Sequence, residues 1–264
     1  MVKKKKVIAI LIAYNAEGTL KEFYKSLPKH LFDEILLFDD ASQDDTSKIS
    51  QSLGILTYKN KFNLGYGGNL KKALVTALSK GADIIVDIHP DNEYKSTAIA
   101  GALEEVQKGS ELVVGNRFSS LSYIAQKSGM FIWKIIPILL LNTISGFFLK
   151  ININDFHQGF RVYTKSLLKK INFEENSNNY IFSFELITQA QMVNAVISEV
   201  PVETSYVGKK RGAGFTSSVN YTLSTFKVIF MYLTAGLGAK YKIFKRPDQN
   251  LNHRITKLTK QYNL

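Results

Sequence analysis

Short apolar segments alternate with longer segments of mixed polarity along the first half of the chain. Apolar runs cover residues 7–14, 34–39, 55–59, 83–88 and 111–115, and the segments 18–27, 45–53, 69–80 and 96–108 have the composition of helices. A continuous apolar run is typical of a strand buried on both faces. Strands and helices that alternate at this spacing predict an α/β fold with a mostly parallel sheet and helices on both faces.

Two further segments are apolar but shorter than a membrane-spanning helix. Fifteen uncharged residues form segment 135–149, and twelve form segment 228–239. A spanning helix needs about 20 such residues. The second segment is flanked by lysines, as in a helix that lies in the membrane interface. A core helix, a helix of an oligomer interface and a true membrane span are the alternatives.

The charge of the chain is concentrated at its two ends. The 264 residues carry a net charge of +12, with four lysines at positions 3–6 and, beyond residue 203, eleven basic residues against Asp248 alone. Basic ends on a nearly neutral body favour contact with a polyanion, either nucleic acid or the anionic cytoplasmic leaflet of a membrane. A solvated basic tail is the alternative.

The overall composition is that of an ordinary globular protein. Apolar residues make up 45% of the chain and charged residues 21%, which excludes a disordered or collagen-like protein. The chain has no cysteine, so it has neither a disulfide nor a thiolate nucleophile, and this fits a reducing cytosol.

Candidate chemistry follows the predicted strands, because parallel sheets bind ligands beyond the carboxyl ends of their strands. The glycine-rich segment 63–69 precedes a helix, so its backbone amides are candidates to contact a phosphate or ribose. A tight turn that requires glycine is the alternative. After the next strand, His89, Asp91 and Glu93 alternate along the chain and are expected to share one face. Such a face suits a divalent cation, whereas a helix cap or turn is the alternative.

The order of motifs resembles the family 2 glycosyltransferases of the GT-A fold, particularly the polyprenyl-phosphate (dolichol-phosphate) mannose or glucose synthase group. Residues 12–17 are similar to the A-Y-N-E signature, 39–44 to D-D-G-S-x-D, 63–68 to N-x-G-x-G and 89–91 to the D-x-D metal motif. Residues 114–117 resemble the G-S-R strand end, 155–161 the D-x-x-x-G-[FY]-R segment and 199–202 the E-V-P strand. The resemblance covers about residues 7–218.

This resemblance implies a role for each matched position. The nucleotide sugar would be bound by Ala13, Tyr14, Glu17, Asp39, Asp40, Gly65 and Gly67, and by Lys210 and Arg211 of a basic loop that closes on the diphosphate. The catalytic residues would be Asp155, Arg117 and Arg161, with Arg117 facing a phosphate and Asp155 as the candidate base for a hydroxyl acceptor. The metal ligands would be Asp91, His89 and Glu93.

His89 stands where the family has the first aspartate of its metal motif. Imidazole is a poorer ligand for Mg²⁺ than for Mn²⁺. We therefore expect either a preference for Mn²⁺ or a cation held by Asp91 and Glu93, with His89 outside the coordination sphere.

Together these features predict a metal-dependent, inverting glycosyltransferase that uses Mn²⁺ or Mg²⁺. It would move a sugar from a nucleotide-sugar donor to a lipid-phosphate or glycan acceptor. Residues 1–218 are expected to form the catalytic GT-A domain, and 219–264 a basic, amphipathic helical region at the cytoplasmic face of the membrane or at a homo-oligomer interface. Nucleic acid is not an expected partner. The alternatives are a sugar nucleotidyltransferase and a non-enzymatic polyanion-binding protein.

Overall fold

The computed structural model describes residues 4–120, 124, 128–130, 132–205, 214–247 and 250–262. Its seven strands are β1 Val7–Ala13, β2 Glu34–Asp39, β3 Leu56–Lys59, β4 Ile84–Ile88, β5 Leu112–Asn116, β6 Arg161–Thr164 and β7 Ile197–Pro201. The helices are α1 Glu17–Ser26, α2 Thr46–Ser52, α3 Tyr66–Ser79, α4 Ala98–Gln107, α6 Ile132–Leu149, α7 Lys165–Lys170, α8 Phe182–Met192, α9 Phe215–Gly236 and α10 Leu251–Tyr262. Four short 3₁₀ turns are η1 Lys29–Leu31, η2 Arg117–Ser119, η3 Phe173–Glu175 and η4 Lys242–Phe244.

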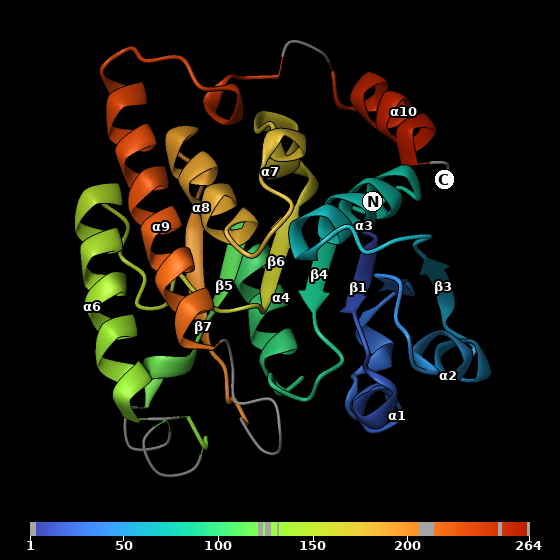
Figure 1. Cartoon of the computed structure of the whole chain (residues 1–264). Coiled ribbons are helices and arrows are strands. Elements are labelled where there is room, and N and C mark those ends of the chain that lie inside the picture. Colours follow the sequence, from blue (N-terminus) through green and yellow to red (C-terminus); the bar gives the residue numbers. More distant parts are fainter. Residues whose placement is uncertain are drawn as a thin grey trace.

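The strands form one sheet in the order β3-β2-β1-β4-β6-β5-β7 (Figure 1). All neighbouring pairs are parallel except those of β6, which runs antiparallel to both β4 and β5. The predicted α/β class and mostly parallel sheet are therefore confirmed. Strand β6 was not predicted; its first residue, Arg161, is the last residue of the matched motif 155–161.

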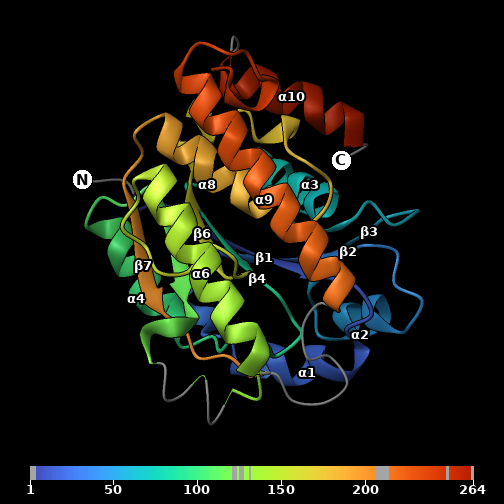
Figure 2. The ribbon, with the colours of Figure 1, turned by 60° about the vertical axis from the view of Figure 1, so that its left-hand side comes forward.

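Helices cover both faces of the sheet, and alternate residues of β1 show how the faces divide. Ile8, Ile10 and Ile12 belong to a core cluster with residues of α3, α7 and α8, whereas Leu11 and Ala13 belong to a cluster with residues of α1 and α4. This follows from the two-residue period of a strand. The three-layer arrangement is visible in Figures 1 and 2.

The last two helices, α9 and α10, pack on the same side of the sheet as α3, α7 and α8. Val228 and Ile229 of α9, and Leu251 of α10, are buried in the same cluster as the sheet residues. Arg254 of α10 forms an ion pair of 2.7 Å with Glu174 of η3. Helices on both sides of residue 218 thus share one core, and a domain boundary at that position remains a prediction.

Helices α6 and α9 lie side by side, at the left in Figure 1 and toward the viewer in Figure 2. They contain the two apolar segments that were noted in the sequence. Within the residues that the structure describes, no helix combines the length and the apolar character needed to cross a membrane.

Candidate active site

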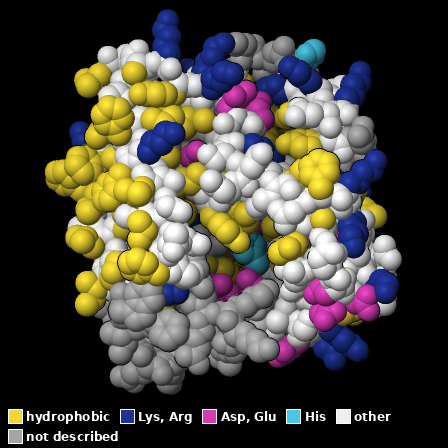
Figure 3. Space-filling model, viewed as in Figure 1, with side chains coloured by type: hydrophobic (Ala, Val, Ile, Leu, Met, Phe, Trp, Pro, Cys, Tyr) yellow, Lys and Arg dark blue, Asp and Glu magenta, His cyan; other side chains and the backbone are white. Residues whose placement is uncertain are grey.

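The carboxyl ends of β1, β2, β4 and β5 lie along one edge of the sheet, because these strands run in the same direction. Antiparallel β6 begins at this edge, so it brings the preceding loop 155–160 beside them. In Figure 3 the surface is hollowed below the middle of this view, and a histidine and acidic side chains lie beside the hollow. The predicted site residues in the described parts of the chain therefore converge on one edge.

The two aspartates at the end of β2 are held by donors from neighbouring turns. Asp39 is fully buried and accepts a hydrogen bond of 2.8 Å from the Ser42 amide, so it shapes the turn and is not exposed to a ligand. Oδ1 of Asp40 accepts hydrogen bonds of 2.8 Å from the Asn60 amide group and from the Leu64 backbone. The orientation of the Asp40 carboxylate is therefore fixed before any ligand arrives.

The end of β1 leaves an aromatic side chain free. Ala13 is buried, but the side chain of Tyr14 is 50% exposed at the carboxyl edge. Glu17, also exposed, accepts a hydrogen bond of 2.9 Å from the Asp45 amide, which links α1 to the turn before α2. The ring of Tyr14 is thus open to solvent at this edge, while the Glu17 carboxylate is held by the turn before α2.

The glycine-rich turn has a different role from the predicted one. The amides of Gly67 and Gly68 donate to the Asn178 carbonyl at 2.8 and 3.2 Å, and the Gly65 amide donates to the Asn63 side chain at 2.9 Å. A Cβ atom on Gly65 would lie 2.5 Å from the Asn178 carbonyl oxygen, and one on Gly67 would collide with the Ser177 carbonyl oxygen. The glycines therefore admit another segment of the protein, and these amides are not free to bind a phosphate.

The acidic loop after β4 separates its histidine from its carboxylates. The ring of His89 points toward the interior, where its Nε2 atom lies 3.8 Å from Oδ1 of Asp87. Asp91 is half-buried and accepts a hydrogen bond of 2.9 Å from the Glu93 amide. Across the described residues, no group of three histidine, aspartate or glutamate side chains is placed to hold a metal ion. The three predicted ligands are therefore not assembled into one site by the protein alone.

The remaining geometry still fits a cation that arrives with its substrate. Mg²⁺ is commonly bound through one or two carboxylates together with substrate phosphates. Asp91 and Glu93 are the carboxylates of this loop, and the ring of His89 is directed toward Asp87. Which of these residues would bind the cation, and which cation, stays a prediction.

The interior next to His89 is polar and charged. Asp87 is fully buried, and burial raises its pKa to about 6, although His89, Arg161 and Tyr163 act in the opposite direction. The Tyr163 hydroxyl donates to Asp87 at 3.2 Å. Asp87 and Arg161 also face each other across the β4 and β6 pairing.

Arg161 lies too deep to contact a substrate in this structure. Its side chain is fully buried and donates to the Phe156 carbonyl at 3.1 Å. Its Nε and Nη1 atoms have no hydrogen-bond partner among the described residues. Arg161 is the first residue of the central strand β6, so its side chain lies beneath the site, and a catalytic role for it stays a prediction.

Arg117 and Asp155 form a buried ion pair at the end of β5. Asp155 accepts from Nε and Nη2 of Arg117 at 2.7 and 2.9 Å, and the two side chains are 0% and 6% exposed. The Arg117 amide also donates to Asp155 at 3.2 Å. Because both carboxylate oxygens are engaged, Asp155 orients Arg117 and is poorly placed to act as the predicted base. Bidentate pairing fixes the plane of the guanidinium group.

Two aromatic residues at the site were not predicted. Tyr221 of α9 forms a hydrogen bond of 3.0 Å between its hydroxyl and Nδ1 of His157, next to the ion pair. In the sequence, Tyr221 is one of several aromatic residues among aliphatic ones, a pattern that indicates a core or membrane face. The contact with His157 can be recognised only in the structure, where Tyr221 lies on the inner side of α9.

Tyr180 is the second of these residues. Its side chain is mostly exposed and stacks on Tyr66, with ring centroids 5.2 Å apart. Partial burial raises the pKa of its hydroxyl, and the nearby carboxylates of Asp91, Glu93 and Asp40 raise it further. Tyr180 therefore lies between the turn after β2 and the acidic loop, although no sequence motif includes it.

The predicted basic loop, with Lys209, Lys210 and Arg211, lies outside the described residues. Its proposed closure on a diphosphate therefore remains a prediction.

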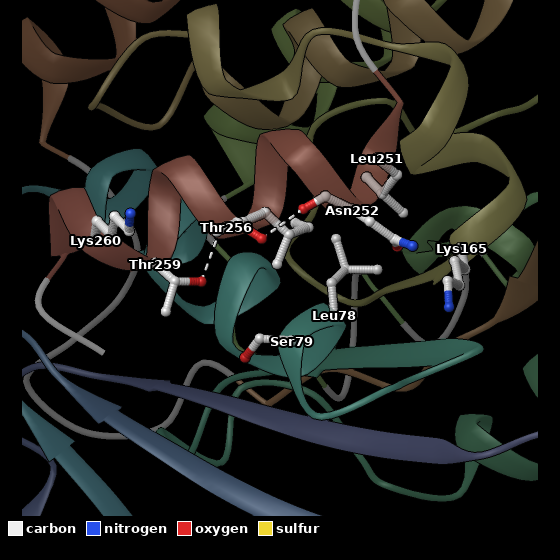
Figure 4. A pocket seen from close by; sticks show the side chains of 9 residues that line it. Leu78, Ser79, Lys165, Leu251, Asn252, Thr256, Thr259 and Lys260 are labelled. Carbon is white, nitrogen blue, oxygen red and sulfur yellow. Dashed lines mark hydrogen bonds between the residues drawn. The ribbon is translucent and has the colours of Figure 1, made fainter.

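A separate pocket of about 440 Å³ lies between α10 and the end of α3 (Figure 4). Leu78 and Ser79 line it directly before β4, so it is at the opposite edge of the sheet from the site. The hydroxyls of Thr256 and Thr259 donate to carbonyls of their own helix. The pocket is therefore separate from the site.

Comparison with known proteins agrees with this architecture. Residues 8–172 match the family model described as glycosyl transferase family 2. The chain is 26% identical over 257 residues to a UDP-N-acetylglucosamine–dolichyl-phosphate N-acetylglucosaminyltransferase of Methanococcus voltae, with 89% of this chain and 97% of the relative covered. It is 24% identical over 202 residues to a polyprenol monophosphomannose synthase of Mycolicibacterium smegmatis, with 74% of each chain covered.

A solved structure shares the fold at low identity. Glucosyl-3-phosphoglycerate synthase from Mycobacterium tuberculosis, in complex with Mn²⁺, UDP and phosphoglyceric acid, superimposes with a TM-score of 0.64 at 13% identity, covering 86% of this chain and 78% of that one. The sheet and the loops at its carboxyl edge thus define a glycosyltransferase of the GT-A fold. The chain belongs to glycosyltransferase family 2, so this activity is favoured over the two alternatives raised by the sequence.

Proposed function

We propose that this protein transfers a sugar from a nucleotide-sugar donor to the phosphate of a lipid acceptor at a membrane surface, with inversion at the anomeric carbon. The observation that carries the choice of a lipid is an exposed apolar face next to the site. The relatives from Methanococcus voltae and Mycolicibacterium smegmatis, whose names specify a dolichyl phosphate and a polyprenol acceptor, support it.

The apolar face is formed by side chains of α6 and α9 that are at least 39% exposed. They are Ile136, Leu140, Phe147 and Phe148 of α6 and Phe215, Val219, Leu223, Phe226, Phe230 and Leu233 of α9, with Leu237 directly after it. Figure 3 shows hydrophobic side chains gathered on the side where these two helices lie. A large contiguous patch of this kind marks an interaction site.

The charges around the apolar face favour a bilayer as its partner. Three exposed lysines lie on or near the two helices: Lys150 directly after α6, Lys227 within α9 and Lys240 shortly after α9. Each lysine near an anionic leaflet contributes about 1 kcal/mol of attraction. The proposed location is therefore peripheral, at the cytoplasmic face of the membrane, where anionic lipids are concentrated. A second copy of the chain is the alternative occupant.

On the donor side, Tyr14 would stack on the base and Asp40 would accept a hydrogen bond from it. Asp91 and Glu93 would hold a divalent cation together with the diphosphate, and Lys210 and Arg211 would contact the diphosphate from the basic loop. When bound, the cation offsets the negative charge of the leaving nucleoside diphosphate. The Mn²⁺ and UDP in the structural neighbour named above are consistent with this assignment.

On the acceptor side, Arg117 would face the lipid phosphate. A phosphate oxygen attacks the anomeric carbon from the face opposite the diphosphate, so one carbon–oxygen bond forms while the other breaks and the configuration inverts. A phosphate is already anionic and needs no strong base. The engagement of both Asp155 oxygens by Arg117 supports this choice over a sugar hydroxyl.

An activity assay tests the proposal directly. The purified chain is incubated with a panel of labelled nucleotide sugars and either a polyprenyl phosphate or a glycan, with Mn²⁺, Mg²⁺ or EDTA. We expect a metal-dependent glycolipid whose anomeric configuration, measured by NMR, is opposite to that of the donor. Transfer to the glycan alone, or retention of configuration, would contradict the proposal.

A vesicle-binding assay tests the membrane surface separately. Phe226→Asp and Phe230→Asp each place a charge on the apolar face, whereas Val196→Asp changes a side chain that is 55% exposed directly before β7. We expect the parent and the Val196 variant to sediment with anionic vesicles at low salt and to be released near 1 M salt, where the Debye length is about 3 Å. If the parent protein stays in solution and forms a dimer, the apolar face of α6 and α9 binds a second copy of the chain instead of a membrane.

A further inference from the structure

Helix α9 connects the apolar face to the interior of the site. Leu223 and Phe226 point to the surface, with 63% and 43% exposure, while Tyr221 points inward and bonds to His157. Residues on the two sides of a helix move together because the backbone hydrogen bonds make the helix rigid. Any displacement of α9 at the surface therefore acts on His157.

The ring of His157 depends on Tyr221 for its position. It packs between the rings of Phe184 and Tyr221, with centroid distances of 5.2 and 5.4 Å. Burial lowers its pKa to about 3, so the ring is neutral near pH 7. Its Nε2 atom has no hydrogen-bond partner among the described residues. Among the described residues, the Tyr221 hydroxyl is thus the one hydrogen-bond partner of the His157 ring.

The backbone of His157 in turn supports the ion pair. Its carbonyl accepts from Nη2 of Arg117 at 3.1 Å, and its amide donates to Oδ1 of Asp155 at 3.3 Å. A shift of this residue would alter the surroundings of both charged groups. The path from α9 to Arg117 therefore consists of one side-chain contact and one backbone contact.

We propose that Tyr221 is a positioning residue, which through His157 couples the seating of α9 on a membrane to the placement of Arg117 for the acceptor phosphate. This inference rests on the proposed function, because it assumes a lipid-phosphate acceptor and membrane contact by α9. Its consequence is that a vesicle should activate the enzyme even when the acceptor is not in the vesicle. Coupling of this kind is reciprocal, so a bound acceptor should also strengthen vesicle binding.

The test uses the full chain and a short-chain, water-soluble isoprenyl phosphate as the acceptor. Activity is measured with and without anionic vesicles that contain no acceptor, and kcat and KM for the acceptor are determined in each case. The variants are Tyr221→Phe and, as a control on the same helix, Tyr232→Phe, which also loses one hydroxyl but lies against Phe244 at 6.2 Å, away from His157. Vesicle sedimentation of each protein is measured in parallel.

We expect vesicles to raise kcat/KM of the parent and of the Tyr232 variant roughly fivefold, the effect of about one hydrogen bond. The Tyr221 variant should sediment with vesicles as the parent does and show almost no stimulation. A merely structural role would lower activity equally in both conditions and leave the ratio unchanged.

Three results would overturn the coupling: a parent that vesicles do not stimulate, a Tyr221 variant stimulated like the parent, or equal loss of stimulation in both variants. An enzyme that transfers no sugar to the soluble or the vesicle-borne acceptor would instead overturn the proposed function itself.

Discussion

The two halves of the site are held together in different ways. On the donor side, local contacts such as Asp39 with Ser42, three positions apart, occur together with contacts between loops, such as Asp40 with Asn60, 20 positions apart. On the acceptor side, Arg117 and Asp155 are 38 positions apart, and His157 and Tyr221 are 64. The donor half therefore combines local turns with contacts between loops, whereas the ion pair and the His157 contact of the acceptor half depend on the packing of distant elements.

The difference also concerns charge. Asp39 and Asp40 receive hydrogen bonds from neutral donors, with Lys59 at 4.0 Å from Asp39, whereas Asp155 forms a close ion pair of 2.7 Å with Arg117 and has almost no solvent contact. A buried ion pair tolerates the loss of one partner poorly, because the other is left as an uncompensated charge. Substitutions should accordingly affect ligand binding in the donor half and folding as well as activity in the acceptor half.

The largest effect is expected for Asp155→Asn. It leaves Arg117 buried without its counter-charge, so the free energy of unfolding should fall by about 3–5 kcal/mol, with loss of transferase activity. Urea denaturation measures the change. Lys108→Ala, which removes an ion pair whose lysine is 68% exposed, is the control and should have a small effect. Equal stability of the Asp155 variant and the parent would show that the pair is not required for folding.

Asp91→Asn should affect binding rather than folding. Removal of this carboxylate is expected to weaken metal-dependent donor binding about 100-fold, in line with the several kcal/mol that a cation contributes. Calorimetry with Mn²⁺ measures the affinity, and thermal unfolding should not change. Unaltered donor affinity would exclude Asp91 as a metal ligand.

Gly67→Ala tests whether the glycine-rich turn serves packing. The added methyl group meets the Ser177 and Asn179 carbonyls and Phe182, so the expected loss of stability is about 1–3 kcal/mol. Gly18→Ala in α1, where nothing lies within 4 Å, should be stabilising by up to about 1 kcal/mol. A Gly67 variant with parental stability and weaker nucleotide binding would restore the phosphate-binding role predicted from the sequence.

The smallest effect is expected for Tyr180→Ala. The open face of its ring lies near the carboxylates of both donor loops, so its loss should weaken nucleotide-sugar binding about tenfold, the size of one aromatic stacking contact. Val196→Ala is the matched exposed control. The affinities for UDP and for a UDP-sugar, compared between variant and parent, show which part of the donor the ring contacts. Parental affinity for both ligands would show that Tyr180 does not contact the donor.

Much of the fold could be predicted from local patterns. Strand β2 has the predicted bounds and β1 differs by one residue, because continuous apolar runs identify buried strands. Helix α3 begins at Tyr66 rather than at residue 69, since glycines do not show where a helix starts. Strand β6 was missed because four residues give too short a pattern to distinguish from a loop.

The sequence by itself determined the class of fold, the family and the edge of the sheet where the chemistry lies, because these depend on periodicity and on the order of motifs. Only the tertiary structure decided what each motif residue does. It directed His89 toward Asp87, assigned the amides of Gly67 and Gly68 to Asn178, placed Arg161 beneath the site and paired Asp155 with Arg117. The physical reason is that a side chain takes its role from the groups it meets, and here those groups come from elements far away in the chain.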